Sequence, residues 1–285
     1  MTSLEIAIAQ TLASDVAAMT PLSGGDVAQA FKVELVDGRT VFAKTKADAP
    51  PNFFSTEAAG LEWLAEPGLA NVANVLAVAD DEPPYLVLEW IDIGGPRSHN
   101  AEAEFGRSLA ELHRSGAETF GRTDKRTTGS LALPNDPAES WAEFYATNRL
   151  GPLATIASQR NALAPQSIDR LLGVADKLNE FETGEPPARL HGDLWAGNRV
   201  VDTAGSSWLI DPAAHGGHRE FDLAMMRLFG GFAEECFSAY DEAFPLAGGW
   251  QERVPLHQLA PLVVHAIKFG GHYGAGVDAA LASLS

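Results

Sequence analysis

One short polar sequence constrains this chain more than any other feature. It runs from His191 through Asp193 to Asn198 and has the pattern H-x-D-x-x-x-x-N. The segment Leu209-Ile210-Asp211-Pro212 follows, with Asp211 13 positions after Asn198. That separation suits a tight hairpin of two short strands. The sequence therefore predicts that Asn198 and Asp211 return to one place in space, beside Asp193.

This order of side chains is the one that the catalytic loop of a kinase needs. Asp193 is the predicted catalytic base, because a carboxylate within hydrogen-bond reach aligns an acceptor hydroxyl and receives its proton. Asn198 and Asp211 are the predicted Mg²⁺ ligands, since this hard cation takes oxygen from one or two side chains, phosphate and water. Gly-Asp and Asp-Pro pairs are also ordinary turn sequences, so the prediction depends on the combination.

The first ~92 residues have the pattern of an antiparallel sheet with one inserted helix. Thr2-x-x-Glu5 is a capping box for an opening helix, and Asp37-Gly38 is a strong hairpin signal. The predicted helices span 2–19 and 54–66, and the predicted strands span 27–36, 40–45, 72–79 and 85–91.

The pattern changes after Asp92-Ile93-Gly94-Gly95-Pro96, a run that breaks regular structure. Helices are predicted over 98–114, 141–150, 167–181, 220–229, 232–244 and 254–269. We therefore expect an α+β, two-lobed, protein-kinase-like fold. Residues 1–92 would form a small antiparallel nucleotide-binding lobe with one main helix, and residues 93–285 a larger, mostly helical lobe for catalysis and substrate.

The predicted strand 40–45 offers a lysine for the nucleotide. Lys44 can point inward beneath the Gly24-Gly25 loop and act as a point charge on the phosphates, with Glu57 on the next helix as its ion-pair partner. Lys46 shares the strand parity and Glu62 the helix, so both remain alternatives. The Gly24-Gly25 loop matches neither a P-loop nor a Rossmann fingerprint. Its backbone N–H groups are predicted to cover phosphates.

The end of the predicted strand 85–91 lies just before the change of pattern. Backbone groups of Glu89 and Ile91 are predicted to bind the edge of an adenine ring. The alternative is an ordinary edge strand.

The net charge of −18, from 38 acidic and 20 basic residues, argues against nucleic acid or an anionic membrane as partner. It suits a cationic or amine-bearing substrate, although an acidic surface also serves solubility. No apolar run approaches the roughly 18 residues of a membrane span. A single cysteine, Cys236, and an N-terminus without a secretory pattern lead us to expect a cytoplasmic protein.

Together these residues resemble the fructosamine/ketosamine 3-kinases, relatives of the aminoglycoside phosphotransferases and choline kinases. The resemblance covers nearly the whole chain. The blocks that carry it are His191 to Asn198 with its Trp195, Ile210-Asp211-Pro212-Ala213, Glu220 to Met225, Leu228 to Phe232, and His265 to Tyr273.

The resemblance implies ATP-dependent phosphorylation of the 3-hydroxyl of a ketosamine, either free or attached to a protein. The 3-phosphate is unstable and releases the amine, so the implied role is deglycation. By position, Lys44 and Glu57 match the nucleotide lysine and its partner, Asp193 the base, and Asn198 with Asp211 the metal pair. Some relatives carry a redox-sensitive cysteine in the glycine-rich loop, and residues 23–28 contain none.

Trp195 follows the predicted base by two residues and can form a wall of the acceptor site. An indole face suits both the C–H surface of a sugar and a nearby cation, whereas the alternative is a tryptophan of the core. His215, Phe229 and Tyr273 are predicted to line the same pocket. Two rival functions remain: a kinase for another cationic acceptor, such as an aminoglycoside or amino alcohol, and a pseudokinase. The presence of base, metal and lysine residues disfavours the pseudokinase.

Overall fold

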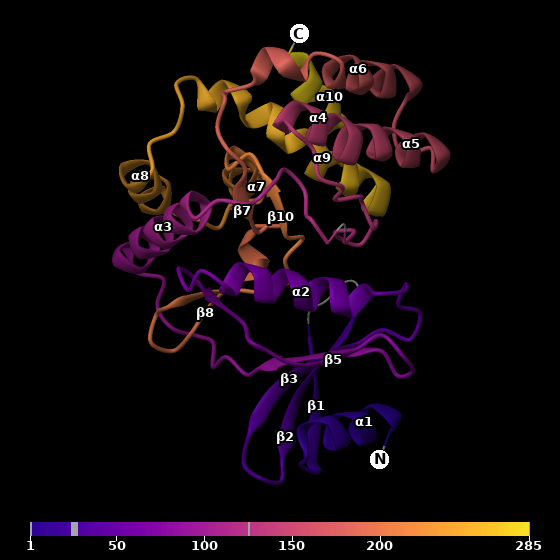
Figure 1. The fold of residues 1–285 in the computed structure, drawn as a ribbon, viewed down its shortest axis with the longest axis vertical. Helices are drawn as coiled ribbons and strands as arrows, with labels where there is room; N and C mark the ends of the chain where they lie inside the picture. Colours follow the sequence, from indigo (N-terminus) through magenta and orange to yellow (C-terminus); the bar gives the residue numbers. More distant parts are fainter. Residues whose placement is uncertain (1, 24–27, 125, 285) are drawn as a thin grey trace.

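The computed structural model describes residues 2–23, 28–124 and 126–284. The elements of its N-terminal third are α1 (Ser3–Leu12), β1 (Val16–Leu22), β2 (Gln29–Leu35), β3 (Thr40–Thr45), α2 (Phe53–Ala65), β4 (Asn71–Val72), β5 (Val75–Ala79) and β6 (Tyr85–Glu89). Five of these strands form one sheet with the order β1-β2-β3-β6-β5. Figure 1 shows this sheet at the end of the molecule that holds the N-terminus.

Helices dominate the rest of the chain. The elements are α3 (His99–Arg114), α4 (Trp141–Tyr145), the π-helix η1 (Ala146–Leu150), α5 (Gly151–Gln159), α6 (Pro165–Ala175), the 3₁₀ helix η2 (Leu178–Phe181), β7 (Ala188–Leu190), the 3₁₀ helix η3 (Ala196–Asn198), β8 (Arg199–Val201), β9 (Ser207–Leu209), β10 (His215–Gly217), α7 (Glu220–Phe229), α8 (Glu234–Ala243), α9 (Trp250–Phe269) and α10 (Tyr273–Ser283). Helices α4, α5, α6, α9 and α10 gather at the end of the molecule that holds the C-terminus (Figure 1).

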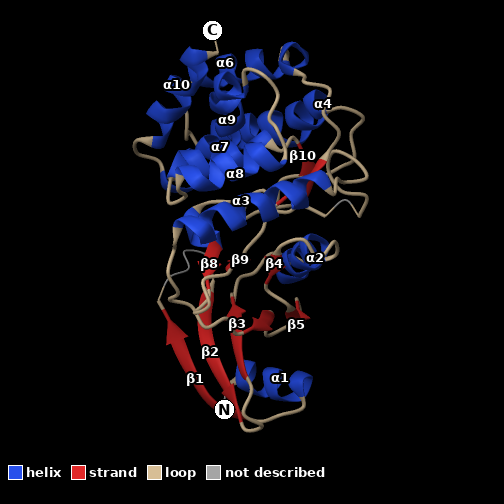
Figure 2. Ribbon diagram, turned by 90° about the vertical axis from the view of Figure 1, so that its left-hand side faces the viewer, coloured by secondary structure: helices blue, strands red, loops and turns tan. Residues whose placement is uncertain are grey.

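The alternation of side chains along the sheet separates two cores. Val41 and Ala43 of β3 are buried with Leu4 and Ile8 of α1 on one face. Lys44 has the opposite parity and therefore points to the face that α2 covers. Figure 2 shows α2 between the sheet and the helices of the other end. The sequence pattern of β3 thus aims one lysine at the junction of the two parts.

The opening helix was predicted too long, because α1 ends at Leu12 rather than at Met19. Its capping box is confirmed, since the Thr2 side chain accepts a hydrogen bond from the Glu5 N–H and the Glu5 side chain accepts one from Thr2. Ala13 stops the helix in the left-handed conformation, with φ at 53°. The following residues join the sheet, where Met19 pairs with Val33 of β2. Strand pairing therefore overrides the helical spacing beyond residue 13.

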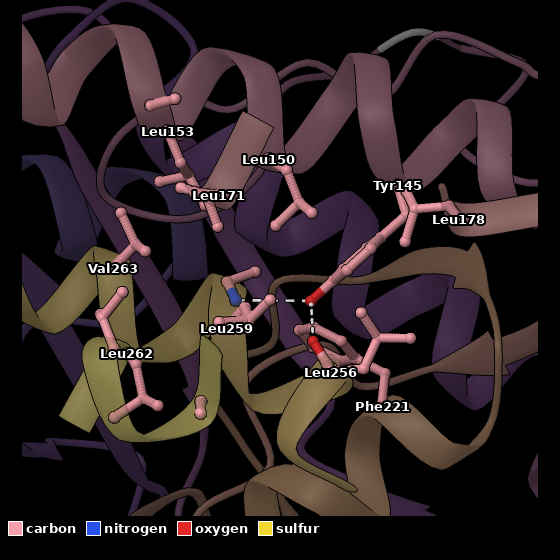
Figure 3. Packing of buried hydrophobic residues seen from close by; sticks show 14 of the residues in the cluster. Tyr145, Leu150, Leu153, Leu171, Leu178, Phe221, Leu256, Leu259, Leu262 and Val263 are labelled. Carbon is pink, nitrogen blue, oxygen red and sulfur yellow. Dashed lines mark hydrogen bonds between the residues drawn. The ribbon is translucent and has the colours of Figure 1, made fainter. Parts of the chain in front are cut away.

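Helix α9 contains Pro261, and a proline removes the N–H that would bond the carbonyl four residues earlier. That carbonyl belongs to His257. The buried Tyr145 hydroxyl lies 3.0 Å from the carbonyl oxygen of Leu256 and accepts the Ala260 N–H at 3.3 Å (Figure 3). It also lies 3.3 Å from the carbonyl oxygen of His257. Tyr145 therefore satisfies the groups that the proline disturbs, and α9 continues to Phe269.

Several helix predictions differ from the structure. The predicted helix 254–269 begins earlier, at Trp250, and the predicted helix 167–181 divides into α6 and η2. Helices α5 and α10 were not predicted, because α5 opens with Gly-Pro and α10 is rich in glycine and alanine. By contrast, α7 has the predicted bounds, and α3 begins one residue after its predicted start because Ser98 is its N-cap.

The predicted hairpin between Asn198 and Asp211 is confirmed. Strands β8 and β9 pair antiparallel, with Val200 opposite Trp208. Strand β4 pairs in parallel with β9, so the small segment at residues 71–72 contacts the helical half. Within the described residues, no helix combines the length and the apolar character that crossing a membrane requires. The boundary at residues 92/93 stays a prediction.

Candidate active site

The loop after β7 is held by a carboxylate from the first turn of α7. The buried Asp222 accepts hydrogen bonds from the N–H of His191 at 2.8 Å and of Gly192 at 2.9 Å. Gly192 has φ at 79°, and a Cβ atom there would lie 2.2 Å from the carbonyl oxygen of Ala213. Glycine is therefore required at this position. The hydrogen bonds to Asp222 and the conformation of Gly192 together fix the direction of the Asp193 side chain.

Asn198 joins the two aspartates of the motif. Its side-chain NH₂ donates to the carbonyl oxygen of Asp193 at 2.8 Å, to the carboxylate of Asp193 at 3.1 Å and to the carbonyl oxygen of Asp211 at 3.3 Å. The amide oxygen takes no part in these bonds. The hairpin of β8 and β9 thus brings Asn198 and Asp211 together beside Asp193, in the arrangement that the spacing predicted.

Asp211 has an unusual backbone conformation, with φ at 52° in the left-handed region. A non-glycine residue held this way costs about 1–3 kcal/mol. The neighbouring backbone is fixed on both sides, since His191 Nε2 lies 2.9 Å from the carbonyl oxygen of Ile210 and the Ala213 N–H donates to the carbonyl of His191 at 2.9 Å. The surrounding bonds therefore stabilise a strained turn that presents the Asp211 carboxylate.

Lys44 links the sheet to this loop. Its ammonium lies 2.6 Å from Glu57 Oε1 on α2 and 2.6 Å from Asp211 Oδ1. Burial alone would lower the pKa of Lys44, but the two carboxylates outweigh it and the pKa rises above its ordinary value. Burial raises the pKa of Glu57 to about 7, whereas Lys44 overcomes burial at Asp211 and lowers the pKa there. Asp211, about half exposed, is the carboxylate that faces outward.

The two alternatives to this pair lie elsewhere. Lys46 pairs with Asp48 at 2.5 Å on the surface. Glu62 lies further along α2, more than a helical turn beyond Glu57. Of Lys44 and Lys46, Lys44 is therefore the one beside Asp211.

Asp193 differs from its neighbours in its protonation. Burial raises the pKa of Asp193 to about 7, and the negative charges of Asp211 and Asp222 act in the same direction. The positive charge of Lys268 and the hydrogen bond from Asn198 oppose this effect. A carboxyl group with a pKa near 7 can both accept and hold a proton at neutral pH, as general bases do.

The predicted adenine contacts lie at the end of β6. The Glu89 N–H donates to the carbonyl oxygen of Asn74 at 3.0 Å, and the Glu89 carboxylate accepts the Asn74 N–H at 2.8 Å. Within the part of the chain that the structure describes, the backbone N–H and C=O of Ile91 form no hydrogen bond. Ile91 therefore has two free backbone groups for a ligand edge. Gly24 and Gly25 lie outside the described residues.

Trp195 covers the loop that follows Asp193. Its side chain is 43% exposed, and the indole lies so close to Gly197 that a Cβ atom there would be 2.2 Å from it. The segment after α7 touches the same loop, because a Cβ atom at Gly231 would lie 2.4 Å from the Cβ of Ala196. Trp195 is therefore a surface residue, and the expected alternative of a core tryptophan does not hold.

Phe229 and Tyr273 meet through a histidine of α9. Ring centroids of Phe229 and His265 are 4.7 Å apart, and those of His265 and Tyr273 are 5.0 Å apart. Phe269, one turn after His265, is 49% exposed and lies 5.5 Å from it. We call Phe229, His265, Phe269 and Tyr273 the α9 aromatic cluster.

His215 does not contact this cluster. Its ring stacks on Phe144 at 5.4 Å and meets Phe221 edge to face at 5.7 Å, and burial lowers the pKa of His215 to about 3. The ring also lies against Gly192. His215 therefore packs against the catalytic loop at Gly192. Its place in the acceptor pocket stays a prediction.

Comparison with known proteins agrees with this geometry. A family model described as fructosamine kinase matches residues 2–284. The chain belongs to the fructosamine kinase family. It is therefore a member of a kinase family, and the expected phosphotransferase class is confirmed at that level.

Three individual proteins show how similar this chain is in sequence and in structure to members of the fructosamine kinase family and to other kinases. A crystal structure of a Thermobifida fusca protein assigned as a fructosamine-3-kinase is 40% identical, with a TM-score of 0.90, over 99% of this chain and 98% of that one. The chloroplastic protein-ribulosamine 3-kinase of Arabidopsis thaliana is 33% identical over 83% of this chain and 73% of its own. Choline kinase LicA of Streptococcus pneumoniae, at 15% identity, has a TM-score of 0.66 over 99% and 97% of the two chains. This last likeness confirms the kinase-like fold.

The sequence interpretation of this fructosamine kinase family member missed three features. Asp222 was quoted only as part of a block, although a buried carboxylate between apolar residues of a helix is a signal in itself. His265 and Phe269 also belonged to a quoted block, without a role. Lys268 carried no signal, because a lysine near a helix end is ordinary.

Proposed function

We propose that this protein is an ATP-dependent kinase that phosphorylates the 3-hydroxyl of ketosamines of the fructosamine or ribulosamine type. The observation that carries the proposal is the convergence of four side chains from distant segments. Asp193, Asn198 and Asp211 share hydrogen bonds, and Lys44 bonds to Asp211 at 2.6 Å. Positioning and charge neutralisation are the main requirements of phosphoryl transfer.

Lys44 is the proposed nucleotide lysine. Glu57 holds its ammonium within 2.6 Å from the side of α2, so the lysine keeps its place when a phosphate replaces Asp211 as its second partner. We propose residues 1–92 as the nucleotide-binding lobe, with Ile91 and the end of β6 at the adenine edge and Gly24-Gly25 over the phosphates.

Asn198 and Asp211 are the proposed ligands of Mg²⁺. The donor set fits, because the Asn198 NH₂ bonds to Asp193 and leaves the amide oxygen for a cation, and Asp211 supplies a half-exposed carboxylate. Bound Mg²⁺ would neutralise negative charge on the phosphates.

Asp193 is the proposed base. Its half-buried carboxylate receives the proton of the acceptor hydroxyl, and a pKa near 7 suits that transfer at neutral pH. The acceptor would lie between Asp193, the exposed face of Trp195 and the α9 aromatic cluster in the lobe of residues 93–285. Aromatic faces and edges suit the C–H surface of a sugar.

The plant relative is named for protein-linked ribulosamine, which supports a ketosamine acceptor that is either free or attached to a protein. We propose that the role is deglycation in the cytoplasm, with release of the amine after phosphorylation. The second candidate, a kinase for an aminoglycoside or amino alcohol, is favoured by the net charge of −18.

A turnover assay separates these functions. A ribulosamine, a fructosamine and kanamycin are compared by ADP release with Mg²⁺ and ATP, and the phosphate position on each product is read by NMR. We expect turnover of the two ketosamines with phosphate on the 3-hydroxyl. Turnover of kanamycin alone, or phosphate at another hydroxyl, contradicts the proposal.

A further inference from the structure

Helix α2 ends with a carbonyl group that the helix itself cannot satisfy. In an α-helix the carbonyl of Trp63 would accept the N–H of the residue four positions later. That residue is Pro67, which has no N–H. The last turn of α2 also contains no basic residue that could donate to its carbonyl groups. The Trp63 carbonyl therefore needs a donor from another part of the chain.

The donor comes from the strand that leads into the catalytic loop. Arg189 of β7 donates from Nη1 to the carbonyl oxygen of Trp63 and, at 2.9 Å, to the carboxylate of Glu66. Its guanidinium lies 4.5 Å from the ring centroid of Trp63, and the guanidinium of Arg122 lies 5.0 Å from the same ring. Arg189 stands four positions before Asp193. The end of α2 is therefore tied to the start of the loop that carries the proposed base.

The middle of α2 rests on the segment that follows β9. A Cβ atom at Gly60 would lie 3.2 Å from the Cβ of Ala214 and 3.3 Å from the Cγ of Pro212. Glu57 precedes Gly60 by nearly one turn and holds the Lys44 ammonium at 2.6 Å. Strand β3 sets the backbone of Lys44, and α2 holds its ammonium through Glu57. The seat of α2 on β7 and on the segment after β9 therefore sets where that ammonium lies.

We infer that Arg189 is a positioning residue for phosphoryl transfer. It fixes α2 to the proposed lobe of residues 93–285 and, through Glu57, places Lys44 for the nucleotide. This inference rests on the proposed kinase function and adds a residue to its machinery. A misplacement of about 1 Å that arises far from the reacting atoms is enough to slow an enzyme strongly.

The alternative is that Arg189 only completes the end of α2 and thereby stabilises the fold. Arg114 is a matched control, because it makes the same three kinds of contact at the end of α8. It donates to the carbonyl oxygen of Ala243 and to the carboxylate of Glu111, and its guanidinium lies 4.9 Å from the ring centroid of Phe244. Helix α8 carries none of the proposed site residues.

The experiment compares wild type with Arg189→Met, Arg114→Met and the double variant Arg189→Met/Pro67→Ala. An alanine at position 67 supplies the missing N–H to the Trp63 carbonyl from within α2 and forms no link to β7. Calorimetric titration gives the Kd for Mg·ATP, and ADP release with a fructosamine gives kcat/KM for ATP. Urea denaturation gives the stability of each protein.

We expect Arg189→Met to weaken Mg·ATP binding and to lower kcat/KM for ATP, each about tenfold, the size usual for a residue that acts through an intermediate element. Arg114→Met should stay within about twofold of wild type in both quantities, and both variants should unfold at lower urea concentration. Pro67→Ala should restore the urea midpoint of Arg189→Met without restoring ATP binding, because the helix end is then satisfied and α2 is still not tied to β7.

A second comparison tests the route through Glu57. In a Glu57→Gln background, Arg189→Met should lower kcat/KM for ATP by less than about twofold further, because residues that act in one chain of contacts are not additive. A second full loss of about tenfold would show that Arg189 acts elsewhere, and the inference would be wrong.

Three other results overturn the inference. They are ATP binding by Arg189→Met within twofold of wild type, an equal loss in Arg114→Met, and full recovery of ATP binding on addition of Pro67→Ala. Each leaves the proposed ketosamine kinase function in place. If wild type turns over no ketosamine, the proposed function is wrong, whereas the Kd for Mg·ATP still tests the role of Arg189.

Discussion

Two carboxylates at the catalytic loop, the buried Asp222 and the half-buried Asp193, have opposite protonation tendencies. Asp222, in the first turn of α7, accepts two backbone N–H groups of the loop and lies 3.2 Å from His113 Nε2. Asp193, on the loop itself, accepts one side-chain amide at 3.1 Å. Burial favours the neutral form of both. Donors nonetheless lower the pKa of Asp222, whereas the pKa of Asp193 rises to about 7.

At Asp222, hydrogen bonds and nearby positive charge outweigh burial and keep the carboxylate ionised, whereas at Asp193 burial and the charges of Asp211 and Asp222 prevail. A carboxylate that accepts several hydrogen bonds holds its loop and does not titrate near neutrality. A carboxylate with few donors remains able to take up a proton. Asp222 therefore positions the loop, and Asp193, the proposed base, can take up a proton near neutral pH.

The largest effect is expected from Asp193→Asn. The amide keeps the size of the side chain but cannot receive the acceptor proton, so kcat should fall about 10³-fold, within the usual range for a general base. ADP release measures kcat, and calorimetric titration with ATP checks that nucleotide affinity stays within about twofold. Near-normal turnover of this variant would show that another group is the base.

Asp222→Asn should have the second largest effect. An asparagine offers one acceptor oxygen where the loop presents two N–H donors, and its NH₂ faces one of them. We expect a loss of about 1–3 kcal/mol in the free energy of unfolding, the cost of an unsatisfied buried group, measured by urea denaturation. Turnover should also fall, because Asp193 loses its fixed direction.

A control separates this effect from the loss of a charge. Asp169 is exposed on α6, and Asp169→Asn should change the unfolding free energy by less than about 0.5 kcal/mol. Full stability of Asp222→Asn would mean that the bonds of Asp222 do not hold the loop.

These two aspartates also show what the sequence could predict. Asp193, Asn198 and Asp211 were predicted as site residues because phosphoryl transfer needs those residue types in that order, and the structure confirms the hairpin that the spacing of the last two predicted. Asp222 acts on His191 across 31 positions of sequence, and no local pattern encodes such a contact.

The fold shows the same division between local and distant signals. The hairpin at Asp37-Gly38 and the helix α7 were predicted because their signals are local. The end of α1 was misplaced because a strand partner decides it, and the start of α9 was predicted four residues too late.

The sharpest test of the comparison is the pH dependence of stability. A carboxyl whose pKa rises on folding binds a proton more tightly in the folded state. Asp193 therefore destabilises the fold progressively as pH rises from about 4 to about 7. Asp193→Asn should accordingly melt above wild type at pH 8, and this gain should shrink toward zero as pH falls to about 4.5.

Asp222 has the opposite sign, because its pKa is lowered on folding. Its contribution to stability is complete above the unfolded pKa of about 4 and is lost only below it. Asp222→Asn should therefore melt below wild type by a constant amount from pH 8 to pH 5. Differential scanning calorimetry of wild type and both variants gives the difference in melting temperature from wild type at each pH. Plotted against pH, this difference should slope for Asp193→Asn and stay constant for Asp222→Asn. Parallel curves would mean that both carboxylates have the same protonation in the folded protein, and the distinction between Asp222 and Asp193 would be wrong.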